Sequence, residues 1–378
     1  MNQYISAESV RLVLSGNDYF DRLSEIISSA KEVLHIQTYI FEDDSTGDDI
    51  KKKLKASSER GVKIYFLADA FGSKGLSKEF VQEIKSAGIK FRFFSPLFSS
   101  EGIYLGRRLH HKIVVADRKT ALIGGINIAD KYHGTEENPP WLDFAVLLKG
   151  DCCMYLHELC EGIYFRKKVV YPSEKKIPEN GKSQVRFRRN DWVRRKNEVH
   201  KSYREAILKA NNSITILASY FLPGVMFRKL LKHAAARGVK IKIIVTGQSD
   251  VPFVRMAEKY LYRYLLNIGS EIYEWKDSVM HGKAMITDES WATIGSYNIN
   301  YLSHYRSIEL NADIMSGEFS KEVSECLNDM IKNHCVQITH GEIEKSQGMF
   351  QKLKSKFAYY FLQFILRIVI PKKRINIR

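Results

Sequence analysis

One short motif occurs in each half of this 378-residue chain, and it restricts the possible folds more than any other feature of the sequence. The first copy is residues 110–117 (HHKIVVAD) and the second is residues 281–288 (HGKAMITD), so both read H-x-K-x4-D. Each is followed by a turn of small residues that ends in an amide, at residues 124–127 (GGIN) and 295–298 (GSYN). Corresponding positions are 171 residues apart, which indicates two duplicated units.

The segments before the motifs repeat in the same order. Residues 31–41 (KEVLHIQTYIF) match residues 212–222 (NSITILASYFL) at an offset of 181, and residues 59–64 match residues 236–241 at an offset of 177. Each is a β-branched run that follows a helical stretch and ends in turn residues. This alternation predicts an α/β fold of two similar lobes, each a mixed, mostly parallel sheet flanked by helices.

The repeat also sets the expected domain boundaries. The expected units are a first lobe at residues 1–171, a linker at 172–185, a second lobe at 186–340 and a C-terminal tail at 341–378. The linker is placed at a stretch that contains Pro and Gly, residues 171–181. The fall in offset from 181 to 171 leaves ten extra residues in the first copy, within residues 97–109. This insertion is either a lid or lipid-gripping loop beside the site, or a tolerated surface insertion.

The residues after each motif lysine read as a buried strand, and side chains two apart on a strand share a face. His110 and Lys112 therefore point the same way, as do His281 and Lys283. A pseudo-two-fold axis between the lobes would bring both pairs into one cleft at the lobe interface. His111 has the opposite parity and is not expected to be catalytic.

Four carboxylates accompany the motifs. Asp117 and Asp288 have the opposite parity and lie near strand ends, so we expect them to anchor the strand or the lobe interface. Asp143 and Glu309 follow the two motif histidines by 33 and 28 residues. A carboxylate on Nδ1 would fix the tautomer of a histidine and stabilise its imidazolium form, and these two are candidates for that role. The alternative is that they are ordinary strand or surface carboxylates.

Two imidazoles, two ammonium groups and two amides around one point fit a phosphodiester substrate. Negative charge builds on the equatorial oxygens during phosphoryl transfer, and Lys112, Lys283, Asn127 and Asn298 would supply the compensating charge and donors. Because a metal ion is the usual alternative source of that charge, no metal or cofactor is expected. One neutral histidine can attack phosphorus while a protonated one releases the leaving alcohol.

The net charge of +16 is concentrated in two segments, which suggests docking to an anionic surface, either a phospholipid leaflet or a nucleic acid. Residues 182–204 hold nine basic and two acidic side chains, and residues 352–378 hold eight basic and no acidic ones. The second segment contains an apolar run at residues 357–370 that is too short to span a bilayer.

As a helix, this run has one narrow polar stripe and suits the plane of an anionic membrane. The alternative is a helix docked on the core or on a second subunit. The expected membrane contacts are Lys352, Lys356, Phe357, Phe361, Phe364, Arg367, Lys372 and Lys373. The first thirty residues show no secretory signal or membrane span, and the five cysteines lack zinc spacing, so we expect a cytosolic protein with cysteines used for packing.

At the paired motifs the sequence resembles the phospholipase D superfamily, over roughly residues 25–335. The stretches around the motifs are most similar to bacterial cardiolipin synthases, at residues 124–132 (GGINIADKY), 141–143 (WLD) and 220–223 (YFLP). The resemblance implies a metal-independent, ping-pong phosphatidyl transfer. It also implies that His110 is the nucleophile that becomes a phosphohistidine.

The same resemblance implies that His281 acts as general acid and then base, with Asp143 and Glu309 as partners of the histidines. A typical donor is phosphatidylglycerol, and a second phosphatidylglycerol is the acceptor, which gives cardiolipin and glycerol. Long cardiolipin synthases carry two N-terminal membrane spans, whereas this chain is closer to the short forms. We therefore expect a peripheral protein on the cytoplasmic face of the cell membrane, with phosphatidylethanolamine or free glycerol as open alternatives among the substrates.

Two other functions compete with this interpretation. A phospholipase D-type phosphodiesterase or nuclease would use the aromatic and basic residues interleaved in residues 182–204. An apolar helix adds nothing to nucleic-acid binding, so no nucleic-acid partner is expected. A non-catalytic membrane-binding scaffold is the second competitor, and it would not require the reactive residues to be intact in both halves.

Overall fold

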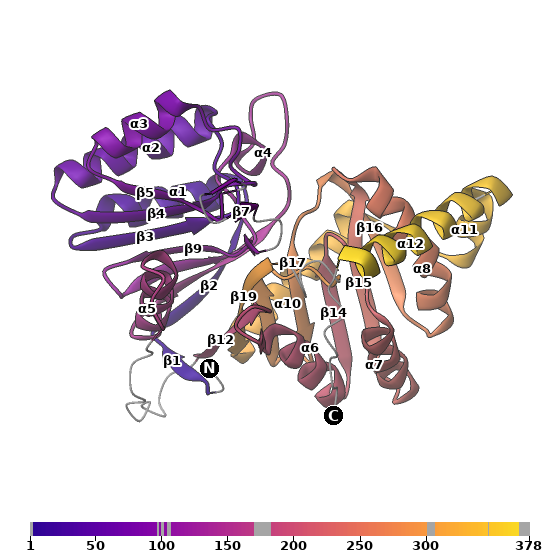
Figure 1. The fold of residues 1–378 in the computed structure, drawn as a ribbon. Coiled ribbons are helices and arrows are strands. Elements are labelled where there is room, and N and C mark those ends of the chain that lie inside the picture. The colour runs from indigo at the N-terminus through magenta and orange to yellow at the C-terminus, as the bar shows by residue number, and fades with distance from the viewer. Residues whose placement is uncertain are drawn as a thin grey trace.

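A computed structural model describes residues 3–96, 98–99, 102–103, 107–169, 183–300, 307–346 and 348–369. The chain forms two α/β lobes that stand side by side (Figure 1). This confirms the predicted fold class. Most of the predicted linker at residues 172–185 lies outside the described residues.

Seven strands form the first sheet, in the order β2 (Ser9–Leu14), β11 (Phe144–Lys149), β10 (Thr120–Gly124), β9 (Lys112–Ala116), β3 (Val33–Thr38), β4 (Lys63–Asp69) and β5 (Lys90–Phe94). The second sheet repeats this order as β12 (Ser183–Asp191), β19 (Ser307–Met315), β18 (Trp291–Gly295), β17 (Lys283–Thr287), β14 (Ser213–Ala218), β15 (Lys240–Gln248) and β16 (Glu271–Val279). The internal duplication therefore extends to the topology of the sheets.

The sheets are mixed, but less parallel than predicted. Strands β3, β4 and β5 run parallel, as do β14, β15 and β16, whereas the pairs from β2 to β3 and from β12 to β14 are antiparallel. The reason lies in the connections, because tight hairpins join β9 to β10 and β17 to β18. The β-branched runs of the sequence do not distinguish a helical crossover from such a hairpin.

Short strands add to these sheets. Strand β1 (Ile5–Ala7) pairs with β12 and β20 (Cys335–Ile338) with β16, while β13 (Lys196–Asn197) pairs with β12 and β8 (Arg108–Leu109) with β19. Strands β6 (Phe98–Ser99) and β7 (Gly102–Ile103) form a separate hairpin. Thus β1, although it lies within the predicted first lobe, belongs to the sheet of the second, because its partner strand is β12.

Helices pack on both faces of each sheet, with α5 and α10 on the faces that meet between the lobes. The first lobe carries α1 (Asn17–Ser29), α2 (Ser45–Glu59), α3 (Lys78–Ser86), α4 (Asp130–His133) and α5 (Cys152–Tyr164). The second carries α6 (Glu198–Lys209), α7 (Val225–Ala236), α8 (Pro252–Asn267), α10 (Gly317–His334), α11 (His340–Ser346) and α12 (Met349–Val369). Helices α1, α2 and α3 share one apolar core with the first sheet, and α6, α7 and α8 share another with the second.

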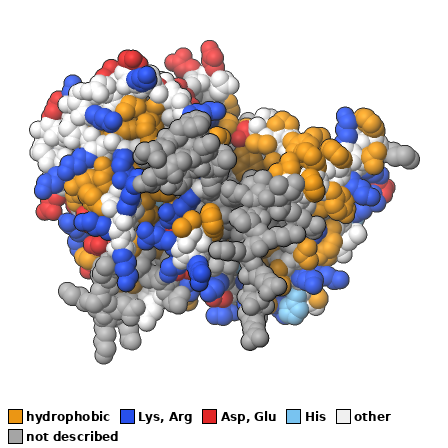
Figure 2. All heavy atoms as spheres, in the orientation of Figure 1, with side chains coloured by type: hydrophobic (Ala, Val, Ile, Leu, Met, Phe, Trp, Pro, Cys, Tyr) orange, Lys and Arg blue, Asp and Glu red, His pale blue; other side chains and the backbone are white. Residues whose placement is uncertain are grey.

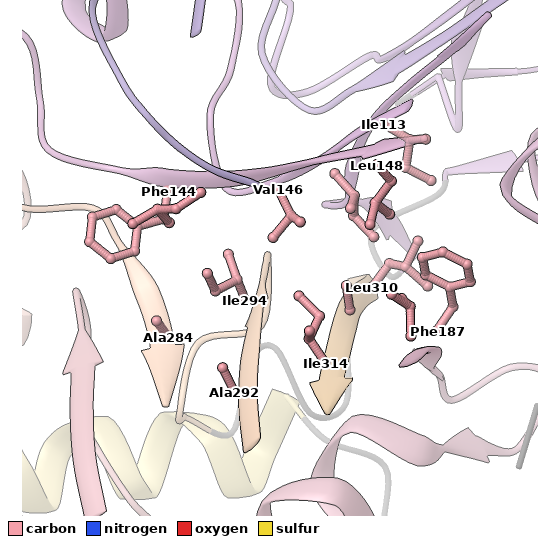
Figure 3. Packing of buried hydrophobic residues seen from close by; sticks show 14 of the residues in the cluster. Ile113, Phe144, Val146, Leu148, Phe187, Ala284, Ala292, Ile294, Leu310 and Ile314 are labelled. Atoms are coloured by element: carbon pink, nitrogen blue, oxygen red, sulfur yellow. The ribbon is translucent and has the colours of Figure 1, made fainter. Parts of the chain in front are cut away.

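A third apolar core joins the two lobes. The inner faces of β9, β10 and β11 meet those of β17, β18 and β19 in one cluster, to which α5 and α10 also contribute. Val146 and Leu148 from the first sheet face Ile294 and Leu310 from the second across this interface (Figure 3). Continuous burial of apolar surface, worth roughly 25 cal/mol per Å², therefore fixes how the lobes dock.

Candidate active site

Both motif histidines lie immediately before a central strand. His110 is two residues before the start of β9 at Lys112, and His281 is two residues before the start of β17 at Lys283. Every residue of both strands is buried, which explains the apolar runs that follow the lysines. Rigid strands therefore position the motifs.

Main-chain hydrogen bonds fasten each motif to the opposite lobe. The amide of His110 donates to the carbonyl oxygen of Ile308 at 3.0 Å, and the amide of His281 donates to that of Leu142 at 2.7 Å. Parallel bridges accompany these bonds, between β8 and β19 and between Leu142 and Met280. Because the contacts run in both directions, the two motifs are held at one interface.

The histidines exchange carboxylates between the lobes. Nδ1 of His110 lies 2.9 Å from Oε2 of Glu309, and Nδ1 of His281 lies 2.6 Å from Oδ2 of Asp143. Both carboxylates are fully buried. The sequence spacing puts each acid after the histidine of its own half, but the structure pairs it with the other. The backbone explains this exchange. The residue before each acid, Ile308 or Leu142, is the one whose carbonyl oxygen accepts the main-chain amide of the histidine from the other lobe.

Burial keeps both imidazoles neutral. It lowers the pKa of His110, against the opposing effect of the Glu309 carboxylate. It also lowers the pKa of His281 to about 3, with a further contribution from the Lys283 ammonium. A carboxylate accepts hydrogen bonds but cannot donate them. We therefore assign a proton to Nδ1 of each ring, which donates to the carboxylate beside it. The Nε2 lone pair of each ring is then available to a substrate.

The two motif lysines are buried near one another. Nζ of Lys112 donates to the carbonyl oxygen of His110 at 2.6 Å, and Nζ of Lys283 donates to that of His281 and lies 3.6 Å from Oδ2 of Asp143. Burial, followed by the charge of Lys283, lowers the pKa of Lys112 to about 7. Burial also lowers the pKa of Lys283. Two ammonium groups close together in a buried site favour an anionic ligand.

The two motif amides are anchored by their oxygen ends. Oδ1 of Asn127 accepts the amide of Ile40 at 2.9 Å, and Oδ1 of Asn298 accepts the hydroxyl of Ser219 at 2.8 Å. Nδ2 of Asn127 donates to the Tyr132 hydroxyl at 2.8 Å. Both amides therefore brace the loops that follow β3 and β14, in addition to any donation from their nitrogens.

Asp117 and Asp288 lie outside this constellation, in hairpin turns. Each carboxylate accepts three consecutive backbone amides, from residues 31–33 and from residues 211–213 respectively. Each aspartate also adopts a left-handed backbone, with φ of 49° and 52°. The two residues thus tie the start of β3 and of β14 to the central hairpins.

Two tyrosines that the sequence analysis did not single out face the histidines. The ring of Tyr39 lies 4.9 Å from that of His110, and the ring of Tyr220 lies 6.0 Å from that of His281, both edge to face. They occupy matching positions of the repeat, 181 residues apart in residues 31–41 and 212–222. An aromatic residue retained at the same position of both copies was the available signal.

One position differs between the copies in a way that suits the two acids. A side chain on Gly125 would lie 2.3 Å from an oxygen of Asp143, so glycine leaves space for that carboxylate. The matching residue, Ser296, donates its hydroxyl to Oε2 of Glu309 at 2.5 Å. The first copy thus accommodates its carboxylate by omitting a side chain, and the second orients its own by a hydrogen bond.

The prediction of a basic surface at residues 182–204 is wrong for three of its arginines, whereas Arg194, Arg195, Lys196, Lys201 and Arg204 are exposed as expected. Arg186 and Arg188 pair with the buried carboxylate of Asp313, and Arg189 pairs with Asp191. These arginines lie on β12, inside the second sheet, where an ion-pair network compensates them. The sequence shows a run of positive charge but not the acidic partners that lie far along the chain.

The C-terminal segment forms α12, which packs on α8 through Ala358 and Tyr359. The alternative of a helix docked on the core therefore applies to one of its faces. Its other face is exposed, with 62% of Phe357, 41% of Phe361 and 59% of Phe364 accessible. Lys352 and Lys356 are also exposed. The side chain of Arg367, and Lys372 and Lys373 altogether, lie outside the described residues.

Within the described part of the chain, no helix has the length and apolar character needed to cross a membrane. Of the insertion at residues 97–109, the structure describes residues 98–99, 102–103 and 107–109. At its described end, the amide of Leu109 donates to the buried carboxylate of Asp69 at 2.8 Å, and Arg107 pairs with Asp191. These contacts fix the chain immediately before His110.

Comparisons with known proteins place the chain in a family. The family described as "Cardiolipin synthase, PLD-like domain" matches residues 23–138 and 203–331, which include both motifs. Cardiolipin synthase B of Escherichia coli K12 is 31% identical over 369 residues, covering 95% of this chain and 89% of the relative. Cardiolipin synthase 1 of Bacillus anthracis is 28% identical, covering 96% of this chain and 72% of the relative.

Among solved structures, phosphatidylserine synthase of Haemophilus influenzae superposes with a TM-score of 0.77 at 15% identity, covering 98% of both chains. Polyphosphate kinase of Porphyromonas gingivalis superposes with a TM-score of 0.62 at 13% identity, covering 96% of this chain and 54% of that one. At these identities the likeness concerns the fold. Together with the sequence matches and the paired motifs, it shows that the chain belongs to the cardiolipin synthase family of the phospholipase D superfamily.

Proposed function

We propose that this protein is a phosphatidyltransferase that makes cardiolipin from two molecules of phosphatidylglycerol and releases glycerol. The observation that carries the proposal is the reciprocal arrangement of His110 with Glu309 and His281 with Asp143 around two buried lysines. This arrangement offers one nucleophile, one acid–base group and two positive charges to a single phosphodiester. Membership of the cardiolipin synthase family supports the choice of lipid substrates.

In the first half-reaction, Nε2 of His110 attacks the phosphorus atom of the donor lipid. The bond between phosphorus and the glycerol headgroup breaks, and His281 donates a proton to the departing oxygen. Glu309 stabilises the positive ring of the phosphohistidine through Nδ1. His281 is neutral in the free protein, so it must first take up a proton from solvent, and the anionic phosphate bound beside it favours this uptake because it raises the pKa of the imidazole.

In the second half-reaction, a hydroxyl group of the acceptor lipid attacks the same phosphorus atom. His281 removes the hydroxyl proton, the bond between phosphorus and Nε2 breaks, and His110 returns to its neutral state. Lys112 and Lys283 offset the charge of the equatorial oxygens in both steps. The nitrogen ends of Asn127 and Asn298 are further donors in this proposal, while their oxygen ends brace the adjacent loops.

The test is product analysis by mass spectrometry after purified protein is incubated with phosphatidylglycerol vesicles. We expect cardiolipin and glycerol from the wild type, none from His110→Ala or His281→Ala, and normal product from His233→Ala, whose ring pairs with Arg237 on the surface. Parallel reactions contain phosphatidylethanolamine or single-stranded DNA. Cleavage of DNA without a lipid product would replace this proposal by a nuclease, and no product from any substrate would favour a scaffold.

The proposal includes peripheral attachment to the cytoplasmic face of an anionic membrane. Support comes from α12, whose outward face presents Phe350, Leu353, Phe357, Phe361 and Phe364 to solvent. Apolar side chains gather over the region of α8 and α12 in the space-filling view (Figure 2). Contiguous exposed apolar surface of this kind marks an interaction site, and lysines beside it favour anionic lipid by roughly 1 kcal/mol each.

Vesicle pelleting tests this attachment. The triple variant Leu353→Ser, Phe357→Ser, Phe364→Ser should lose most of its binding to phosphatidylglycerol vesicles and keep the midpoint of thermal unfolding, because these side chains are exposed. The matched control is Leu208→Ser, an exposed leucine on α6. Equal pelleting of the triple variant and the control would show that α12 does not bind the membrane.

A further inference from the structure

A group of metal-ligating side chains lies between α5 and the first sheet. His35 comes from the middle of β3, and His157 and Glu161 lie one turn apart on α5. One ligand atom from each of the three residues falls within 4.8 Å of the others. Nε2 of His157 is 3.6 Å from Oε1 of Glu161. Residues four apart on a helix share a face, so both α5 side chains are directed to one neighbourhood.

The histidines of this group have unmet hydrogen-bonding capacity. His35 has no exposed surface, and neither of its ring nitrogens has a hydrogen-bond partner. His157 is also buried, and its Nδ1 has no partner. Every neutral imidazole has one donor and one acceptor nitrogen, and a buried polar group without a partner costs about 1–3 kcal/mol. Two adjacent rings with this deficit require a physical explanation.

Aromatic packing explains the ring planes but not the nitrogens. His35 stacks on Tyr65 with ring centroids 5.0 Å apart, and the ring of His157 meets it edge to face at 4.7 Å. Stacking engages the faces of a ring, whereas the nitrogen lone pair and N–H lie in the ring plane. The stacked arrangement therefore leaves the polar edges of the two histidines unaccounted for.

The protonation states suit metal ligands. Burial lowers the pKa of His35 to about 3 and also lowers the pKa of His157, so both rings are neutral and carry a lone pair at pH 7. The charge of Arg118 contributes to both shifts. That charge opposes a cation, but Arg118 is itself 3.6 Å from the Glu32 carboxylate, and Glu161 brings a negative charge to the group.

We propose that His35, His157 and Glu161 bind one transition-metal ion of the zinc class and thereby clamp α5 to β3. Two imidazole nitrogens and a carboxylate oxygen, with water as the fourth ligand, form a common tetrahedral zinc set. The side chain of Glu161 is 41% exposed, which gives the ion and the water a route from solvent. Ligand atoms about 2.0–2.2 Å from one metal are at most about 4.4 Å apart, so binding must draw these three atoms, now within 4.8 Å of one another, closer together.

The site is structural and takes no part in phosphoryl transfer, for which no metal is expected. It lies beside an existing clamp between the same two elements, in which Nε2 of Gln37 donates to the carbonyl oxygen of Cys160 at 2.8 Å. The other end of Gln37 lies 2.8 Å from Nε2 of His111, next to the catalytic His110. The metal would therefore stabilise the folded state by the free energy of binding and reinforce the strand layer behind the active site.

Calorimetric titration of the chelator-treated full chain with Zn²⁺ tests the proposal, with the midpoint of thermal unfolding as a second readout. We expect one equivalent of Zn²⁺ to bind and to raise the midpoint. Glu161→Gln and His157→Gln should weaken binding by at least about tenfold and abolish the rise in midpoint. Glu161→Gln keeps the size of a half-exposed side chain, so we expect the variant to fold normally. Circular dichroism checks this.

Two controls separate this site from other histidines. His233→Gln alters a surface ring, and His110→Gln alters the phosphoryl-transfer site. Both should bind one equivalent of Zn²⁺ with the affinity of the wild type. Absence of stoichiometric binding by the wild type, equal affinity in Glu161→Gln, or loss of binding in His110→Gln instead would each overturn the proposal.

Discussion

The carboxylate of Glu309, from the second lobe, lies 2.9 Å from Nδ1 of His110, from the first lobe. The reciprocal contact joins Asp143 to His281 at 2.6 Å. Each histidine therefore depends on the opposite lobe for its orientation and for the stabilisation of its charged form. Neither lobe alone contains a complete histidine–carboxylate pair, and a continuous apolar core holds the two lobes together.

Removing the charge of either carboxylate should impair catalysis without unfolding the protein. Glu309→Gln and Asp143→Asn keep the volume of a fully buried side chain, but they permit the wrong imidazole tautomer. We expect kcat to fall by roughly 10²–10⁴-fold in each variant. Steady-state assay on lipid vesicles measures this, and Glu79→Gln, which alters an exposed acid on α3, is the control. A loss below tenfold in both variants would show that the carboxylates do not serve the histidines.

Activity should fall on the alkaline side as Lys112 loses its proton. Burial and the neighbouring Lys283 lower its pKa to about 7, so the ammonium is present below that pH and is lost as pH rises through it. Lys112→Arg keeps the charge at any accessible pH, and its alkaline limb of kcat/KM should move to higher pH even where its maximum rate is lower. Lys119→Arg, at the exposed end of the hairpin, should retain the wild-type profile. An unchanged limb in Lys112→Arg would assign the titration to another group.

The rings of the tyrosines beside the histidines should contribute more to activity than the tyrosine hydroxyl groups. Tyr39 meets His110 edge to face, and Nζ of Lys112 lies 5.4 Å from its ring centroid. Tyr39→Phe should therefore keep most of the activity, whereas Tyr39→Ala should reduce kcat by about tenfold as the imidazole and ammonium lose a packing surface worth roughly 1–2 kcal/mol. Kinetics of the two variants distinguish packing from hydrogen bonding. Equal losses would point to the hydroxyl group instead.

Asp117 should contribute to stability and not directly to chemistry. Burial tends to raise the pKa of its carboxyl, but hydrogen bonds from residues 31–33 outweigh this and lower it. Its stabilising effect is therefore complete above the unfolded pKa and is lost as pH falls through the folded value. Asp117→Ala should reduce the free energy of unfolding by about 2–3 kcal/mol at pH 7.

Urea denaturation of Asp117→Ala and of Asp288→Ala checks this expectation, with Asp21→Ala, an exposed residue of α1, as the control. The two variants should resemble each other because the copies make the same three contacts. A normal unfolding midpoint combined with lost activity would show that these aspartates act in catalysis and not in stability.

Much of the fold was accessible from the sequence because duplication leaves a direct record in it. The spacing of 171 residues identified His110 and His281 and the strands that begin at Lys112 and Lys283. Strand parity correctly separated these residues from His111, which contacts Gln37 on the other side of the strand. These are local properties of the chain, so local patterns express them.

The parts that escaped prediction depend on contacts between distant segments. The exchange of Glu309 and Asp143 between lobes follows from how the lobes dock, which no spacing within one half encodes. The same holds for Arg188, which reads as surface charge but is only 2% exposed and pairs with Asp313. For α12, the helical pattern was visible, but the face buried against α8 depends on that neighbour.

The central claim is that both lobes act on one phosphorus atom, with His110 as the nucleophile and His281 as its acid and base. The most direct test is to react the wild type and His110→Ala with phosphatidylglycerol labelled in its phosphate, quench the reaction rapidly, and locate the label by peptide mass spectrometry. The account predicts a phosphatidyl group on His110 in the wild type, no label in His110→Ala, and no label on any other histidine. Label on His281 in the wild type, or an undiminished acid-labile label in His110→Ala, would contradict it.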